Sequence, residues 1–172
     1  MTATPILAVG SIALDTIETP QGQRRDILGG SATFFGVAAA LFAPVRLVGV
    51  VGSDYPEAGW QLLRSRGIDV SDVQRVPGAT FRWGGRYTND LNDRETLFTE
   101  LGVFENFEPV LSDQNRRSEI VYLGNIQPSL QLAIRAKTPG ARRVISDTMN
   151  LWINQNAEEL NEVLSKTDIL LI

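Results

Sequence analysis

The chain has 172 residues and a mass of 18.9 kDa, a size that suits one globular domain. It contains neither histidine nor cysteine, which excludes Ser-His-Asp and Cys-His catalytic sites, disulfides and nearly all zinc sites. Its 16 basic and 20 acidic residues give a net charge of −4, a balance that does not suggest a nucleic-acid-binding surface.

The first part of the chain alternates between predicted strands and helices. The apolar run 6–10 ends in glycine, which is typical of a strand buried on both faces, and a polar hairpin with its tip at 21–23 follows. A helix is predicted at 32–42, and because it is apolar on every side we expect it to be buried. A second buried strand at 45–51 and a helix at 56–66 come next.

The segment 80–101 has a different pattern. Phe81, Trp83 and Tyr87 alternate with polar residues, a period of two that indicates a half-exposed strand. A polar turn at 89–93 leads into a second alternating stretch. We therefore expect an antiparallel hairpin that is separate from the buried sheet.

The last part of the chain returns to buried strands and helices. They are predicted in turn at 120–123, 128–137, 143–146, 156–166 and 168–172. In the second of these helices, Asn156 followed three residues later by Glu159 is typical of a capping box. No stretch is long enough to cross a bilayer and no signal peptide is visible, so we expect a cytoplasmic protein without membrane or nucleic-acid partners.

Strands that alternate with helices predict a Rossmann-like α/β fold, in which helices cover both faces of a mainly parallel sheet. Ligands of such sheets bind beyond the carboxyl ends of the strands. In this sequence those ends lie at 10–15, 52–54, 124–125 and 147–150.

Two features near the first strand could bind a ligand. Asp15 follows that strand closely, and its carboxylate can accept hydrogen bonds from ligand hydroxyls; a turn or surface aspartate is the alternative. Gly29 and Gly30 precede a helix, so that the backbone can approach a ligand and helix N–H groups can point at it. A tight turn alone would also explain these glycines.

The remaining candidates each leave two interpretations open. Asp54 either faces a ligand or caps the following helix. Asp147 and Asn150, at the end of a strand, either face a ligand or cap a helix. Arg82 and Arg86 share one face of the hairpin and either contact an anionic or polyhydroxyl ligand or are simply solvated.

Four stretches together point to a family. They are Ile6-Leu7-Ala8-Val9-Gly10-Ser11 with Asp15, Leu28-Gly29-Gly30-Ser31-Ala32, Val48-Gly49-Val50-Val51-Gly52-Ser53-Asp54 with Gly59, and Arg66-Gly67-Ile68-Asp69. Their order resembles the ribokinase-like (PfkB) family of carbohydrate and nucleoside kinases. Members have roughly 300 residues, so 1–172 is expected to be the N-terminal part of one such domain, without its C-terminal part.

The resemblance implies that Asp15 and Gly30 hold hydroxyls of the acceptor substrate and that Gly29 shapes the turn. The hairpins at about 16–28 and 80–101 resemble the small antiparallel β lid that closes over the substrate and, in many relatives, pairs two subunits. A homodimer through the lid is therefore expected. The candidate substrate-binding residues are Asp15, Gly29, Gly30, Phe34, Arg82, Asn125, Asp147 and Asn150.

Two departures from the family pattern concern the acceptor. Many members have an asparagine that contacts the sugar at the position of Phe34, so polyol recognition there is altered or lost. Some sugar-acid kinases of the family carry an arginine soon after an Asp-x-Asn stretch, and no arginine follows the stretch 147–152 of this sequence. Assignment as a ribokinase or a ketodeoxygluconate kinase is therefore not supported.

The resemblance implies a kinase that uses ATP and Mg²⁺ and phosphorylates a hydroxyl of a sugar or nucleoside. The family's Asn-x-x-Glu motif and its Gly-Ala-Gly-Asp motif with the catalytic base are expected beyond Ile172. No catalytic residue and no metal ligand are therefore assigned in this chain, which by itself should be inactive. The alternative is a non-catalytic ligand-binding or structural module of the same fold. A dinucleotide-binding oxidoreductase is disfavoured because Gly10 does not begin a Gly-x-Gly-x-x-Gly motif.

Overall fold

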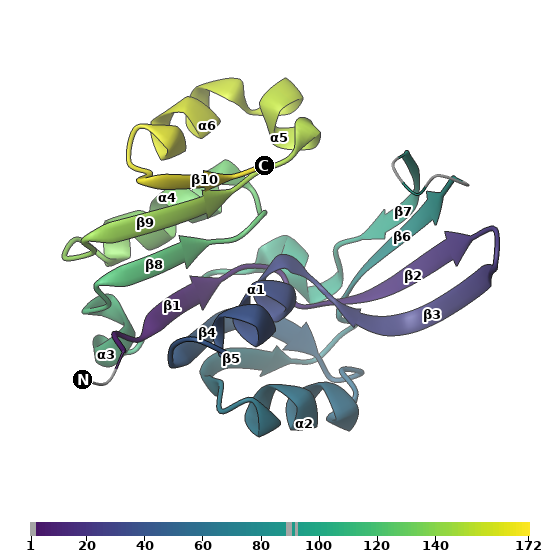
Figure 1. Cartoon of the computed structure of the whole chain (residues 1–172), viewed down its shortest axis with the longest axis horizontal. Helices are drawn as coiled ribbons and strands as arrows, with labels where there is room; N and C mark the ends of the chain where they lie inside the picture. Colours follow the sequence, from purple (N-terminus) through teal and green to yellow (C-terminus); the bar gives the residue numbers. More distant parts are fainter. Residues whose placement is uncertain (1–2, 89–90, 92) are drawn as a thin grey trace.

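A parallel sheet with the strand order β10-β9-β8-β1-β4-β5 lies at the centre of the molecule (Figure 1). The computed structural model describes residues 3–88, 91 and 93–172, so that three positions of the predicted turn at 89–93 lie outside the described residues. The strands of this central sheet are β1 (Ile6–Val9), β4 (Val45–Gly52), β5 (Asp69–Val76), β8 (Ile120–Leu123), β9 (Arg143–Asp147) and β10 (Ile169–Leu171). All their pairings are parallel, as the alternation of strands and helices predicts.

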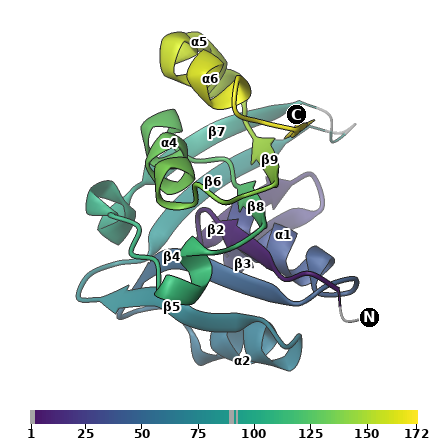
Figure 2. The same cartoon turned by 90° about the vertical axis from the view of Figure 1, so that its left-hand side faces the viewer.

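Helices cover both faces of the central sheet, and Figure 2 shows α1 and α4 on opposite sides of β1 and β8. The helical elements are α1 (Ser31–Ala39), α2 (Glu57–Ser65), η1 (Gly102–Asn106), α3 (Asp113–Arg116), α4 (Pro128–Lys137), α5 (Asn150–Gln155) and α6 (Ala157–Leu164). Successive residues of a strand point to opposite faces. Ala8 of β1 therefore joins the core that includes Ala32 of α1, whereas Leu7 and Val9 join the core that includes Ile134 of α4. The predicted α/β fold class is confirmed.

A second sheet, with the strand order β3-β2-β6-β7, extends from the carboxyl ends of the central strands (Figure 1). Its strands are β2 (Ala13–Thr19), β3 (Gly22–Gly29), β6 (Phe81–Tyr87) and β7 (Arg94–Glu100). The two hairpins are antiparallel, as expected, but β2 and β6 pair in parallel, so the sheet is mixed rather than purely antiparallel. The pairing is parallel because both strands run away from the same edge of the central sheet.

Helix α1 is not buried on every side, contrary to the sequence prediction. Phe34 is 65% exposed and Phe42, just beyond the helix, is 84% exposed. Small residues let α1 approach the sheet closely: a Cβ added at Gly36 would lie 3.2 Å from a methyl group of Leu47. Ala32, Gly36 and the ring of Phe35 face the sheet, whereas Phe34 lies on the outside of the helix.

Other predictions for the second half of the chain need correction. Strand β10 is exposed rather than buried, because it pairs with β9 alone at the edge of the sheet. Strand β5 at the other edge and helix α5 were not predicted, since neither has a clear apolar period. The predicted capping box does not form: Asn156 Nδ2 donates to Glu159 Oε2, and no side chain caps α6. No helix within the described ranges is long and apolar enough to span a membrane.

Candidate functional site

The carboxylate of Asp15 lies directly over Gly29, on the pair of strands β2 and β3. A Cβ added at Gly29 would collide with both carboxylate oxygens of Asp15, so a larger residue at position 29 would displace this carboxylate. Asp15 is partly buried, and among the described residues nothing donates a hydrogen bond to its carboxylate. Burial raises the pKa of Asp15 to about 6. A carboxylate held in this way is available to accept hydrogen bonds from a ligand.

Gly30 connects β3 to α1 in a conformation that favours glycine, with φ at 96°. A Cβ at this position would strike the backbone oxygen of Ser11. That oxygen accepts a hydrogen bond of 3.0 Å from the Ala32 N–H, and the Ser31 N–H donates to Ser11 Oγ at 3.1 Å. The Gly29-Gly30 pair is thus a tight turn that also brings the start of α1 against the end of β1.

The first turn of α1 also meets the carboxyl end of β8. A Cβ added at Gly10 or at Gly124 would lie 2.6 Å from Ser31 Oγ. The glycines at the ends of β1 and β8 therefore allow the helix to begin directly above both strands. The topology brings Asp15, Gly29 and Gly30 together beside these strand ends, as expected for ligand binding by an open α/β sheet.

Asp147 at the end of β9 takes part in a hydrogen-bond network. Its Oδ2 accepts a bond of 3.0 Å from the Tyr122 hydroxyl, and the backbone N–H groups of Asn125 and Thr148 also donate to its carboxylate. Burial nevertheless raises the pKa of Asp147. Asn125 Oδ1 accepts a bond of 2.9 Å from Trp152 Nε1, which leaves the Nδ2 group as the free, donating end of the amide.

Neither Asp147 nor Asn150 caps a helix. Helix α5 has no side-chain cap, and Asn150 is its exposed first residue. Sequence reasoning missed Gln131, whose Nε2 donates to the backbone oxygens of Leu123, Gly124 and Asp147 at 2.8–3.2 Å. Gln131 is only 1% exposed, so this amide ties the ends of β8 and β9 together inside the core. The sequence signal that could have identified Gln131 is a polar residue on the apolar face of the predicted helix.

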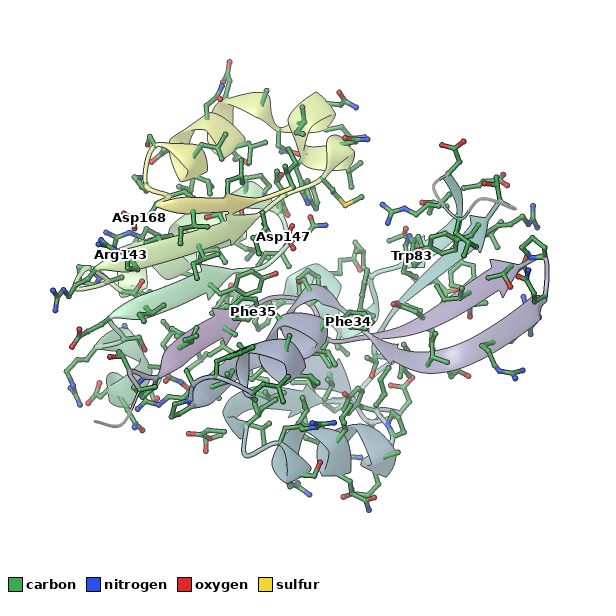
Figure 3. The ribbon with its side chains drawn as sticks, in the orientation of Figure 1. Phe34, Phe35, Trp83, Arg143, Asp147 and Asp168 are labelled. Carbon is green, nitrogen blue, oxygen red and sulfur yellow. The ribbon has the colours of Figure 1, made fainter. Side chains whose placement is uncertain are left out.

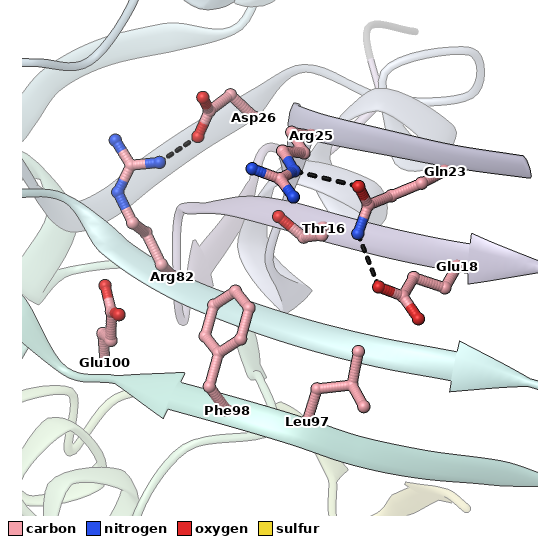
Figure 4. A pocket seen from close by; sticks show the side chains of 9 residues that line it. All are labelled: Thr16, Glu18, Gln23, Arg25, Asp26, Arg82, Leu97, Phe98 and Glu100. Atoms are coloured by element: carbon pink, nitrogen blue, oxygen red, sulfur yellow. Dashed lines mark hydrogen bonds and ion pairs between the residues drawn. The ribbon is translucent and has the colours of Figure 1, made fainter.

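Asp54 and Arg82 join the central sheet to the second sheet. Asp54 accepts hydrogen bonds from the Thr80 N–H (2.7 Å), the Thr80 hydroxyl (2.6 Å) and Arg82 Nη2 (2.9 Å). Although burial opposes it, these bonds keep the pKa of Asp54 below its usual value. Asp54 is therefore not a helix cap. Arg82 also pairs with Asp26, so its charge is already balanced (Figure 4).

The cavity shown in Figure 4 lies on the opposite face of the second sheet from Asp15. Thr16, Glu18 and Arg82 line it and alternate along β2 and β6 with Asp15 and Trp83, which point to the other face. Its volume is about 430 Å³. Arg86, on the cavity side, pairs with Glu18 at 2.9 Å, so neither Arg82 nor Arg86 is a free cation.

The candidate site residues fall into three groups. Asp15, Gly29 and Gly30 are together; Phe34 follows them on α1 (Figure 3). Asn125, Asp147 and Asn150 come from the ends of β8 and β9, and Arg82 points to the other face of the second sheet. In the part of the chain that the structure describes, no three acidic residues are arranged to hold a metal ion.

Comparison with known proteins gives the following relatives. The chain is 27% identical over 169 residues to a cytidine kinase of Thermococcus kodakarensis, a match that covers 96% of this chain and 60% of that kinase. A nucleoside kinase of Methanocaldococcus jannaschii, an archaeal member of the ribokinase family, matches with a TM-score of 0.73 and 23% identity over 98% of this chain and 60% of that chain. Arabidopsis thaliana ribokinase, complexed with ribose and ATP, matches with a TM-score of 0.71 and 20% identity, again over 98% and 60%. No protein-family model matches the chain.

The fold is that of an α/β protein with a central parallel sheet and a smaller mixed sheet at the carboxyl ends of its strands, where open α/β sheets bind their ligands. The matches confirm the resemblance to the ribokinase-like (PfkB) family of kinases. The chain spans about 60% of the length of the relatives it matches, which agrees with the expected N-terminal portion.

Proposed function

We propose that the chain is the acceptor-binding part of a ribokinase-like kinase, which transfers the γ-phosphoryl group of ATP to a hydroxyl of a sugar or nucleoside. The observation that carries this proposal is the carboxylate of Asp15, which lies over Gly29 beside the start of α1 and accepts no hydrogen bond from any residue that the structure describes. Ionised Asp15 accepts hydrogen bonds from acceptor hydroxyls. Because its pKa is about 6, binding should strengthen as the pH rises through that value.

Asn125, Asp147 and Asn150 are proposed to bound the acceptor site from the ends of β8 and β9. Tyr122 and Trp152 fix the orientations of Asp147 and Asn125, so that a donor amide and an acceptor carboxylate are already positioned before a ligand arrives. Hydrogen-bonding groups held in place by others lose little conformational freedom on binding. The second sheet is proposed to act as the lid, with strands at about 16–28 and 80–101.

ATP with Mg²⁺ is the proposed phosphoryl donor, because the resemblance to the ribokinase-like family implies it. Bound magnesium would neutralise charge on the phosphates. The described residues assemble no metal site of three carboxylates. The catalytic base is assigned to no residue of this chain, which should bind the acceptor without hydrolysing or transferring phosphate from ATP.

Calorimetric titration of the chain with ribose and with nucleosides tests this proposal. We expect Asp15→Asn to weaken binding of a hydroxylated ligand about tenfold or more, because a charge-assisted hydrogen bond is lost. Glu108→Gln, which alters an exposed carboxylate with no recorded partner, is the matched control and should bind as the parent does. Ligand binding that does not depend on Asp15 would refute the assigned site.

Coupled measurement of ADP release with ATP, Mg²⁺ and a panel of sugars and nucleosides tests the second half of the proposal. The chain alone should release little or no ADP, and robust release would show that it holds a complete catalytic site. A non-catalytic module of the same fold is the less favoured alternative, since the relatives named above are kinases. The alternative predicts that a full-length form of the protein is inactive too.

A homodimer is proposed on the cavity face of the second sheet. That face carries Leu97 and Phe98 together with charges of both signs, including Arg25 and Glu100, which a two-fold-related copy could match. Leu97→Glu should shift sedimentation toward the monomer, whereas Leu101→Glu, outside this face, should not. A parent chain that sediments as a monomer at all concentrations would contradict this interface. A cytoplasmic location stays a prediction.

A further inference from the structure

The neighbours of Asp15 on its face of the second sheet are apolar. The register of β2 with β3 places Ile27 opposite Asp15, and the register of β2 with β6 places Trp83 opposite it on the other side. Directly opposed residues in a sheet point to the same face and contact each other. The register therefore places an aliphatic and an aromatic residue on either side of Asp15, whose carboxylate itself lies over Gly29.

Trp83 is held in place by residues of its own strand, β6, and of the neighbouring strand β7. Its ring lies against Gly85, where a Cβ would collide with the indole, and the Arg94 guanidinium lies over the ring, 5.2 Å from the centroid. Gly85 is buried although it is on a strand of the second sheet, which shows that the ring covers it. Trp83 is therefore a fixed aromatic residue on the same face of the sheet as Asp15, with its ring over Gly85, rather than a freely rotating side chain.

Phe34 adds a second aromatic surface near Asp15. It belongs to the first turn of α1, where its N–H donates to the Gly30 oxygen at 3.1 Å. Figure 3 shows Phe34 at the end of α1 next to β2 and β3. The adjacent Phe35 stacks on Tyr122 with ring centroids 3.6 Å apart, whereas Phe34 has no ring partner among the described residues and is 65% exposed.

This composition fits a ligand with two unlike parts. A free sugar carries hydroxyl groups all around its ring, and it would leave several of them facing Ile27, Trp83 and Phe34 without hydrogen-bond partners, which is unfavourable. A ligand with a hydroxylated part and a flat aromatic part matches one carboxylate among apolar surfaces.

We propose that the acceptor of this site is a nucleoside, with a ribose hydroxyl bound to Asp15 and the base stacked on Phe34. Trp83 and Ile27 flank the ligand on the sheet side. This inference rests on the proposed function, since it names the substrate class of the same site. Phe34 is thereby assigned as a specificity-determining residue.

Titration calorimetry of the chain with cytidine, adenosine and ribose tests the inference. The nucleosides should bind about tenfold or more tightly than ribose, as expected for one stacked base. Phe34→Ala should remove that difference and leave ribose binding unchanged, whereas Phe34→Tyr should retain it. Phe42→Ala is the matched control, because Phe42 is also a mostly exposed phenylalanine and lies beyond the far end of α1. Since Phe34 is mostly exposed, all variants should fold, and thermal melts verify this.

The outcomes separate the two proposals. If ribose binds as tightly as the nucleosides, with Asp15→Asn weakening both, the nucleoside inference is wrong and the acceptor site stands. If nucleoside binding is tighter but is unaffected by Phe34→Ala, the assignment of Phe34 is wrong. If the folded chain binds none of the three ligands, the acceptor site itself is refuted.

Discussion

Replacing Asp15 by asparagine should stabilise the protein at neutral pH while weakening ligand binding. The carboxylate is partly buried without a hydrogen-bond donor, and its pKa rises from 3.8 to about 6 on folding. If it were not reduced by contact with water, a pKa difference of that size would lower the free energy of unfolding at neutral pH by about 3 kcal/mol. Because Asp15 remains partly open to water, we expect a gain of roughly 1–2 kcal/mol for Asp15→Asn at pH 7.5.

The pH dependence of this gain follows from proton linkage. The folded state holds a proton on Asp15 more tightly than the unfolded state does, so the parent is stabilised at low pH and loses that stability as the pH rises through 6. Asparagine has no proton to lose. Urea unfolding of both proteins should therefore show the full difference at pH 7.5 and only a small part of it at pH 4.0. The reasoning fails if Asp15→Asn is less stable than the parent at pH 7.5, or if the difference is the same at both pH values; Glu108→Gln should show no comparable change.

Three further substitutions, together with Gly140→Ala as a control, test the packing around the site. Gly29→Ala should cost about 1–3 kcal/mol in thermal or urea unfolding and lower ligand affinity, because its methyl group displaces the Asp15 carboxylate. Gly140→Ala, where a Cβ meets nothing within 4 Å, should have little effect in the same measurements. Asp54→Ala should raise amide hydrogen exchange in β6, since Thr80 and Arg82 lose their shared acceptor; unchanged exchange would exclude Asp54 as the joint between the sheets. Gln131→Met should destabilise the protein by about 1–3 kcal/mol, measured by urea unfolding, because three backbone oxygens lose their donor.

The course of the central sheet was predictable from the sequence because its signals are local. Short apolar runs identify strands that are buried on both faces, and helical patterns between them require parallel crossovers. Gly29 and Gly30 before a helix and Asp15 after a strand could likewise be recognised from their immediate neighbours. Local patterns predicted the edge strands of the sheet less well. Strand β5 was not predicted, and β10 was expected to be buried although it is exposed.

The environment of each candidate side chain was decided by tertiary structure. The parallel register of β2 and β6 places Trp83 beside Asp15, and no local pattern fixes a pairing between strands so far apart in the chain. The same register puts Arg82 on the opposite face, where Asp26 and Asp54 balance its charge. The composition, with no histidine and no cysteine, left carboxylates as the side chains that could carry a proton near neutral pH. Only the fold shows that Asp15 is a partly buried carboxylate to which no described residue donates a hydrogen bond, because burial and hydrogen bonding depend on residues brought together from distant segments.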